Sequence, residues 1–186
     1  VINVRVDFLW ARSRWENVSP IALQNANLSP GGERALFEYR GEVFTVPREH
    51  GDPRNITNSP GVADRFPVWS PDGDRIAWFS DEGGEYTLVI GDQSGLGETV
   101  TIELDNPSFF FRPEWSPDGR YIAYTDTHLN LYYVDVDSKE ITLVDTDSYV
   151  RPERTMNPVW SPDSRWIAYA RTLENMFKAI VLYNVE

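Results

Sequence analysis

Short apolar runs separated by turn-forming residues dominate this sequence and predict β-strands throughout. The runs are rich in β-branched and aromatic side chains, clusters of Gly, Pro, Asp and Asn divide them, and no apolar stripe recurs at helical spacing. In one well-defined stretch we expect four strands, over residues 66–69, 74–80, 85–91 and 98–104. The second of these is apolar on both faces at residues 76–79, so it fits a sheet that is covered on both sides.

One unit is written several times along the chain. The segment WSPDG at 69–73 recurs at 115–119 and, as WSPDS, at 160–164, and each copy is followed by an Arg and an apolar strand. A weaker copy, LSPGG, occupies 28–32. The Ser residues of the four copies are separated by 70 − 29 = 41, 116 − 70 = 46 and 161 − 116 = 45 residues. A period of about 40 to 50 residues with strand-like contents is typical of β-propeller blades.

The predicted fold is therefore all-β, a single β-propeller segment over 1–186 built of four-stranded antiparallel blades. The expected parts are a strand at 1–6, a linker at 7–24 and blades at about 25–57, 66–104, 112–144 and 157–185, of which the last ends after its third strand. The first strand could complete the last blade and close a small ring, or the blades could form an arc of a larger ring. We favour the arc because four blades lie at the small end of the known range.

An open arc would leave a strand edge near 179–183 with unpaired backbone groups beside apolar side chains. We expect this edge to pair with residues 2–6, either of the same chain or of a second copy.

The repeated residues of the unit have a structural explanation. Pro presets its own φ, the Asp carboxylate can accept hydrogen bonds from backbone N–H groups, and Gly takes a positive φ in the turn. Large rings at one place in every first strand fill the space between adjoining blades. A stacking surface for bases or sugars, or a carboxylate or metal site, is the alternative, but a functional group is rarely needed in every repeat. The residues concerned are Trp69, Trp115, Trp160, Asp72, Asp118 and Asp163.

Composition removes several classes of function. Lys plus Arg is 17 and Asp plus Glu is 29, so the formal charge is −12, which argues against binding to nucleic acid or to an anionic membrane. The chain has no Cys and two His, which excludes disulfides and thiol chemistry and argues against a multi-His metal site. No apolar run approaches the roughly 18 residues of a membrane span. We expect a soluble chain without a cofactor, in a compartment that the sequence leaves open between cytoplasm and periplasm.

The sequence shows no catalytic constellation of its own. A Ser-His-carboxylate site would need His50 or His128, both of which lie in polar turns, and no Ser sits in a Gly-x-Ser-x-Gly elbow. The acidic pairs at 135–137 and 145–147 lack the Gly and terminal Glu of a calcium loop, so we assign them to a solvated acidic rim. We therefore predict neither a catalytic residue nor a metal ligand.

The connections from each outermost strand to the next innermost strand carry the candidate binding residues. In an acidic protein, Arg and aromatic side chains gathered where the chain crosses towards the axis could line a pore or bind the carboxylate of a peptide. Alternatively, the Phe residues wedge between blades and the Arg residues pair with neighbouring Asp and Glu. The candidates are Arg65, Arg112, Arg151, Arg154, Phe109, Phe110, Phe111 and Tyr149.

The WSPDG unit resembles the TolB-type propeller repeat over nearly the whole chain. Longer stretches at 34–47, 54–65, 124–132 and 160–169 are similar to the second, seven-bladed propeller of tricorn-type serine peptidases. This resemblance implies a propeller that guards access to a separate catalytic region and handles oligopeptides released by larger proteases. That region lies C-terminal to the family's propellers and is not contained in these residues, so no catalytic residue carries over.

Three functions remain from these observations. The first is a non-catalytic propeller segment of a tricorn-like peptidase that filters or guides peptides. The second is a free-standing TolB-like module that binds a partner protein on its rim, and the third, with the least support, is a propeller enzyme with its own carboxylate site. The expected partner is a peptide or a protein, neither nucleic acid nor membrane, and self-association through the terminal strands is compatible with the predicted edge.

Overall fold

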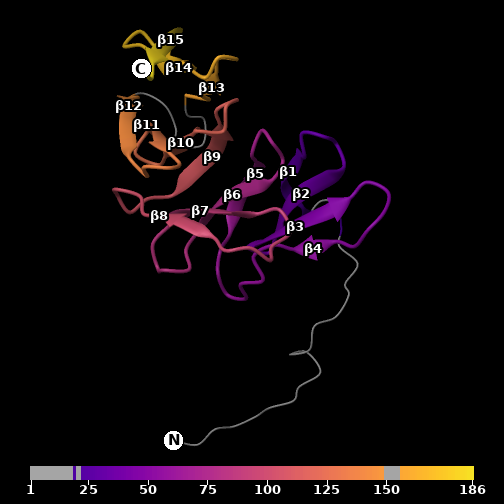
Figure 1. Cartoon of the computed structure of the whole chain (residues 1–186). Coiled ribbons are helices and arrows are strands. Elements are labelled where there is room, and N and C mark those ends of the chain that lie inside the picture. The colour runs from indigo at the N-terminus through magenta and orange to yellow at the C-terminus, as the bar shows by residue number, and fades with distance from the viewer. Residues whose placement is uncertain (1–18, 20–21, 149–155) are drawn as a thin grey trace, which may run out of the picture.

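The computed structural model describes residues 19, 22–148 and 156–186, and its regular structure is β (Figure 1). Blade 1 consists of β1 (Gln24–Leu28), β2 (Arg34–Tyr39), β3 (Glu42–Pro47) and β4 (Arg54–Asn55). Blade 2 consists of β5 (Arg65–Trp69), β6 (Arg75–Ser80), β7 (Thr87–Asp92) and β8 (Val100–Ile102). Blade 3 consists of β9 (Phe110–Trp115), β10 (Tyr121–Asp126), β11 (Asn130–Asp135) and β12 (Ile141–Thr146). Blade 4 consists of β13 (Val159–Trp160), β14 (Trp166–Thr172) and β15 (Lys178–Asn184).

Each blade is an antiparallel meander in which consecutive strands are hydrogen-bonded neighbours. The first three blades have four strands and the fourth has three. The blades follow one another in chain order around an arc, from the indigo blade 1 to the yellow blade 4 (Figure 1). The predicted all-β propeller fold is confirmed. The strand predicted at 1–6, and with it the expected pairing with the edge near 179–183, lies outside the described residues.

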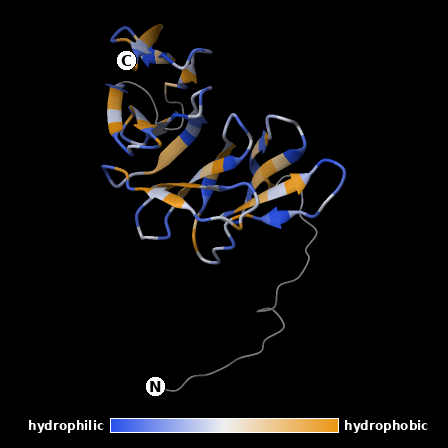
Figure 2. Cartoon of the chain, in the orientation of Figure 1, coloured by the Kyte–Doolittle hydropathy of each residue, from blue (hydrophilic) through white to orange (hydrophobic). Residues whose placement is uncertain are grey.

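The interfaces between blades form the hydrophobic core. In β6, Ile76 and Trp78 pack against blade 1, whereas Ala77 and Phe79 pack against blade 3, as the two-residue period of a strand requires. All four side chains are at most 4% exposed, so this strand is covered on both faces. Hydrophobic segments accordingly follow the strands and hydrophilic segments follow the loops (Figure 2).

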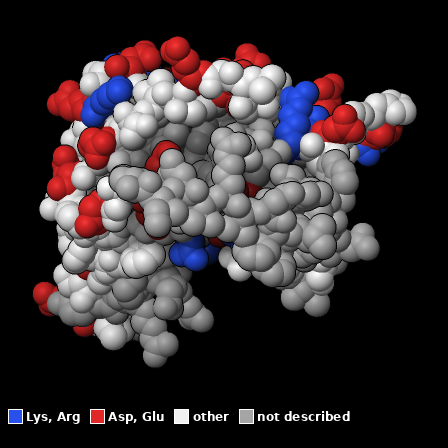
Figure 3. Space-filling model, turned by 90° about the horizontal axis from the view of Figure 1, so that it is seen from below, with Lys and Arg blue, Asp and Glu red and all other residues white. Residues whose placement is uncertain are grey.

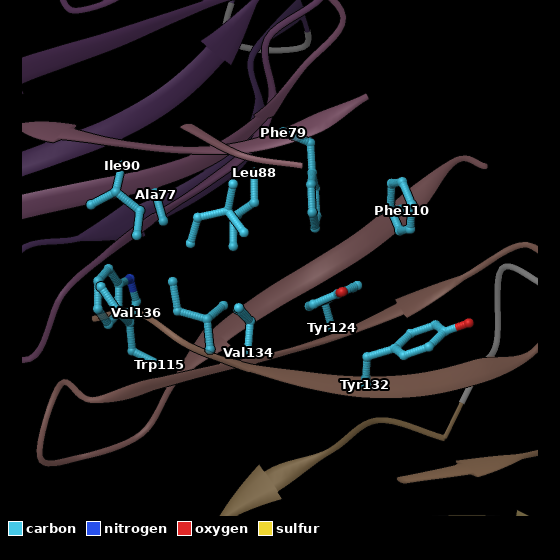
Figure 4. Close-up of a cluster of buried hydrophobic side chains, with 12 residues drawn as sticks. Ala77, Phe79, Leu88, Ile90, Phe110, Trp115, Tyr124, Tyr132, Val134 and Val136 are labelled. Carbon is cyan, nitrogen blue, oxygen red and sulfur yellow. The ribbon is translucent and has the colours of Figure 1, made fainter. Parts of the chain in front are cut away.

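Figure 4 shows the interface between blades 2 and 3 as two facing layers of side chains. Blade 2 contributes side chains of β6 and β7, and blade 3 contributes side chains of β9, β10 and β11 and of the turn after β11. The labelled members of this cluster are Ala77, Phe79, Leu88, Ile90, Phe110, Trp115, Tyr124, Tyr132, Val134 and Val136. Burial of such a cluster stabilises the fold by about 25 cal/mol for each Å² of apolar surface removed from water.

The Ser-Pro-Asp turn joins the first and second strands of each blade and is held by its own side chains. In blade 2, Ser70 Oγ accepts a hydrogen bond from the backbone N–H of Arg75 at 2.9 Å and donates to Asp72, which in turn accepts from the backbone N–H of Asp74 at 3.0 Å. Gly73 takes a φ of 78°. Blade 4 has Ser164 at this position with a φ of 61°, and its hydroxyl accepts from the backbone N–H of Asp118 in blade 3 at 3.0 Å. That contact offsets the strain of a non-glycine residue in the left-handed region.

Replacing Trp115 by Ala should lower the free energy of unfolding by about 3 to 5 kcal/mol, because the indole is buried between blades and its loss leaves a cavity. Urea-induced unfolding measures the change. Leu143→Ala, on β12 where the side chain is 52% exposed, is the matched control, with an expected effect of less than about 0.5 kcal/mol. Equal stabilities of the wild type and Trp115→Ala would contradict the packing described above.

Replacing Asp72 by Asn should make the free energy of unfolding decrease less steeply as the pH falls into the acidic range. The hydrogen bond from Ser70 is the main cause that lowers the pKa of Asp72 below its usual 3.8. A lowered folded-state pKa stabilises the fold above the unfolded-state pKa, and this contribution disappears as the pH falls through the folded value. We therefore expect unfolding free energies measured below about pH 4 to fall less steeply in the variant. Asp137→Asn, whose side chain forms no hydrogen bond among the described residues, should keep the steepness of the wild type.

Candidate functional site

The first strands of the blades face one another around the arc and border a groove. Contacts between neighbouring sheets run largely through β1, β5 and β9. A pocket of about 400 Å³ is lined by Asn27, Leu28, Pro30, Val68, Trp69, Ser70, Pro71, Arg112, Pro113, Glu114 and Trp115. A second pocket of about 210 Å³ is lined by Asn25, Ala26, Asn27, Phe66, Pro67, Val68, Arg112 and Pro113. The two share Asn27, Val68, Arg112 and Pro113, so they form one continuous surface, which we call the inner groove.

A β-bulge recurs near the start of the first strand in blades 1 to 3, and all four blades share a left-handed residue at this place. These residues have positive φ values of 49° at Asn25, 54° at Phe66, 49° at Arg112 and 42° at Asn157. They follow the spacing of the repeat, and the strand register shifts at the first three. Asn tolerates the left-handed region because its short side chain bonds locally, whereas Phe and Arg do so at a cost. The backbone geometry is therefore kept in every blade while the side chain changes.

Arg112 is the exposed cation of the inner groove. Its Nη1 donates a hydrogen bond to Asn157 Oδ1 at 2.8 Å, so the guanidinium lies towards the bulged residue of the next blade. Among the described residues no carboxylate forms an ion pair with it. In a chain of net charge −12, a guanidinium held by a neutral amide keeps its other donors available for an anion.

Arg65, by contrast, is engaged at the junction of blades 1 and 2. Its Nε lies 3.9 Å from Oε1 of Glu38, which is only 6% exposed. Glu38 Oε2 also accepts hydrogen bonds from Asn25 Nδ2 at 2.5 Å and from the backbone N–H of Phe66 at 3.1 Å. The guanidinium therefore offsets the cost of a buried carboxylate that joins the two blades.

The three consecutive Phe residues lie in three different environments. Phe110 is buried, with its ring stacked on Phe79 at 5.4 Å. Phe111 is half-buried edge-on to Phe66 at 5.8 Å, and Phe109 remains 53% exposed beside Tyr86 at 5.3 Å. Phe110 and Phe111 belong to β9, which begins two residues before the predicted start of the blade. The other candidates, Tyr149, Arg151 and Arg154, lie outside the described residues.

The repeated Trp and Asp residues lie in equivalent places in blades 2 to 4. Trp69, Trp115 and Trp160 are 6 to 7% exposed. Trp115 lies under the guanidinium of Arg75 at 4.9 Å, and Trp160 stacks on Tyr121 at 5.8 Å. Like Asp72, the turn carboxylates of Asp118 and Asp163 accept a Ser hydroxyl and a backbone N–H.

A Ser, a His and an Asp do come together outside the groove, but their arrangement does not form a catalytic triad. Ser108 Oγ lies 3.4 Å and Asp126 Oδ2 lies 3.6 Å from the same ring atom, Nδ1 of His128. A triad needs the nucleophile and the carboxylate on opposite ring nitrogens so that the ring can relay a proton. Asp126 instead accepts from the backbone N–H groups of His128 and Asn130, both at 2.9 Å, and so shapes the turn.

The assignment of both acidic pairs to a solvated rim was wrong for three of the four residues. Asp135 is 9% exposed and pairs with Arg120 Nε at 2.9 Å. Asp147 is 3% exposed and accepts the backbone N–H of Thr172, while Asp145 accepts the hydroxyl of Tyr169 at 2.9 Å. These carboxylates connect strands and blades, and Asp137 alone is exposed.

Within residues 22–148 and 156–186, no group of three or more His, Cys, Asp or Glu side chains is placed to hold a metal ion. No helix in the described part of the chain is long and apolar enough to cross a bilayer.

Acidic side chains gather along the rim in the view from below (Figure 3).

Sequence reasoning missed Glu114, which lies on β9 two residues after Arg112. Burial raises the pKa of the Glu114 carboxyl, and the backbone N–H of Trp160 opposes that effect. Its own backbone carbonyl accepts the indole N–H of Trp160 at 3.0 Å. The corresponding residues of the other blades are Asn27, Val68 and Val159, so only this departure from the repeat distinguishes the position in the sequence.

Known proteins share parts of this sequence. The family model of the tricorn protease second beta propeller domain matches residues 23–186. The chain is 41% identical over 51 residues to the Tol-Pal system protein TolB of Nitrosomonas europaea, covering 27% of this chain and 12% of that protein. It is 32% identical over 83 residues to the uncharacterized peptidase YuxL of Bacillus subtilis, covering 44% of this chain and 11% of that protein. The matched parts thus span about a tenth of each of these relatives.

Solved structures agree in fold. The crystal structure of the tricorn protease superposes with a TM-score of 0.69 at 17% identity, covering 91% of this chain and 17% of that one. A putative TolB from Agrobacterium tumefaciens gives a TM-score of 0.64 at 23% identity, covering 86% of this chain and 57% of that one. At these identities the likeness concerns the propeller architecture.

Arg112→Asn should keep or raise the stability of the fold, because Asn adopts the left-handed backbone at less cost than Arg; we expect a gain of up to about 1 kcal/mol in urea unfolding. Arg112→Val, which places a β-branched side chain at the same φ, should lower stability by about 1 to 2 kcal/mol. A clear loss of stability in Arg112→Asn would mean that the Arg side chain itself supports the fold.

Proposed function

The chain belongs to the tricorn protease second beta propeller domain family, and we propose that it is a non-catalytic propeller segment that guides oligopeptides towards a catalytic region outside these residues. The peptide would lie in the inner groove, where the first strands of blades 1 to 3 meet. The repeated Trp residues form part of the wall of this groove, and residues that differ from blade to blade, such as Arg112, supply its charged groups.

The proposal rests on the surroundings of the Arg112 guanidinium. A guanidinium presents planar, paired donors that match a carboxylate, and such charge-assisted hydrogen bonds are stronger than neutral ones. Arg112 is exposed to the groove, is oriented by Asn157 and has no carboxylate partner among the described residues. A peptide with a free C-terminal carboxylate is the ligand that this arrangement fits.

A second function draws on the likeness to TolB, which reaches 41% identity over 51 residues. A TolB-like interaction module would bind a partner protein on the loops at the rim of the blades. The exposed Phe109 beside Tyr86 is one apolar contact available there. Substitution of Phe109 would weaken such binding, whereas substitution of Arg112 would leave it unchanged.

The test is the affinity of the 186-residue chain for short peptides, measured by isothermal titration calorimetry. Peptides with a free C-terminal carboxylate should bind about tenfold more tightly than the same peptides as amides, and Arg112→Gln should remove this difference. Arg48→Gln, an exposed Arg in the loop after β3, is the control and should bind as the wild type does. Equal affinity of acid and amide for the wild-type chain would refute the proposal.

A further inference from the structure

Glu114 lines the same pocket as Arg112 and has no cationic partner in the described part of the chain. Both residues line the 400 Å³ part of the inner groove, yet they do not form an ion pair with one another, and no Lys or Arg among the described residues pairs with Glu114. The side chain is half-buried. A carboxylate withdrawn from water without a compensating cation costs free energy, and only the backbone N–H of Trp160 reduces that cost.

The fold does not require an acid at this position. Blades 1, 2 and 4 build the same strand with Asn27, Val68 and Val159 in the place of Glu114. The structural contact made here, from the indole N–H of Trp160, goes to the backbone carbonyl of Glu114, which any residue supplies. What distinguishes blade 3 is therefore the charge of the Glu114 side chain, on a residue that lines the groove.

The surroundings of Glu114 suit a long basic side chain. Val68, Pro113 and Trp69 give this part of the groove an apolar lining. The methylene stems of Lys and Arg pack along such surfaces while their charged ends reach a polar partner. A ligand cation placed here would compensate the half-buried carboxylate and cover apolar surface in the same step.

Arg112 and Glu114 lie two residues apart on β9 and line the same pocket without forming an ion pair with one another. A lysine or arginine residue at the C-terminus of a peptide carries both an α-carboxylate and a side-chain cation, so it can pair with both groups. We infer that the inner groove selects peptides that end in Lys or Arg, with Arg112 binding the terminal carboxylate and Glu114 binding the basic side chain. The inference rests on the proposed function and goes beyond it by naming the C-terminal residue of the peptide that the groove recognises.

Matched tripeptides test this selectivity on the 186-residue chain. The set is Ala-Ala-Lys, Ala-Ala-Lys with an acetylated side chain, Ala-Ala-Leu, and Ala-Ala-Lys as its C-terminal amide. Acetylation removes the side-chain charge and keeps the stem, so it isolates the contribution of Glu114. By calorimetry the wild type should bind Ala-Ala-Lys about tenfold more tightly than the acetylated peptide.

Two variants test the roles of Glu114 and Arg112 separately. Glu114→Gln should abolish the preference for lysine over acetyl-lysine and retain the preference for free acid over amide, whereas Arg112→Gln should do the reverse. Glu140→Gln, in the exposed turn before β12, is the control and should behave as the wild type. Thermal unfolding of each variant verifies that it folds, and the comparison of peptides on the wild type needs no variant.

The outcomes separate this inference from the proposed function. If the wild type prefers acid over amide but binds lysine and acetyl-lysine equally, the role of Glu114 is refuted and peptide binding through Arg112 stands. If Glu114→Gln keeps the lysine preference, the assignment of Glu114 is refuted. If no peptide binds at millimolar concentration, both the inference and the proposed function fail.

Discussion

The structure depends on one constraint, which is that the middle strands of a blade are apolar on both faces and need a neighbouring blade on each side. In β7 five consecutive residues are buried, although a strand that faces water on one side would alternate. The equivalent strand of blade 4, β15, alternates instead, with Ile180 and Leu182 being 75% and 62% exposed on the face turned away from blade 3. A blade is therefore not a stable unit by itself, and stability resides in the interfaces. This is why a large Trp recurs at the same place in blades 2 to 4. Trp115 lies under Arg75 of the preceding blade, and Trp160 stacks on Tyr121 of the preceding blade.

The same constraint divides the residues of the first strands into two sets. The Trp and the turn that follows it hold adjoining blades together, so they repeat. The residue with the left-handed backbone and the residue two positions later line the groove in blades 1 to 3, and they differ from blade to blade. The left-handed backbone is retained at Asn25, Phe66, Arg112 and Asn157. A position that keeps a costly geometry in every repeat while its chemistry varies is suited to recognition, because each blade presents a different group at the same place.

Much of the architecture was predictable from the sequence because the repeat reports it directly. Three features of the sequence indicate blades before any contact is known: the spacing of the Ser residues, the strand at 76–79 that is apolar on both faces, and the turn residues.

The site was less predictable. Alternation cannot show which of Phe109, Phe110 and Phe111 is buried, because the bulge at Arg112 shifts the register of β9. Asp135 and Asp147 resemble solvated acids in sequence, yet their partners Arg120 and Thr172 are set by turn geometry and by contact between blades. Glu114 was missed for the same reason. The sequence shows a single acid in a strand, but it does not show that no Lys or Arg among the described residues pairs with that acid.

The charges of the chain act on a ligand in two ways, through a long-range electrostatic field and through short-range contacts in the groove. The net charge of −12 attracts cationic peptides to the molecule and speeds their encounter with it, but at physiological ionic strength this field is screened over about 8 Å. The distant acidic rim therefore contributes little to discrimination once a peptide lies in the groove. Selection falls to the groups that a peptide touches inside the groove, of which Glu114 is partly removed from water, so that its charge is less screened and costly to leave unpaired. Arg112 and Glu114 are the groups of opposite sign that share the larger pocket of the inner groove without pairing with one another. Because the described residues leave both groups without a counter-charge, a ligand that carries the complementary pair of charges gains the free energy of pairing with each of them.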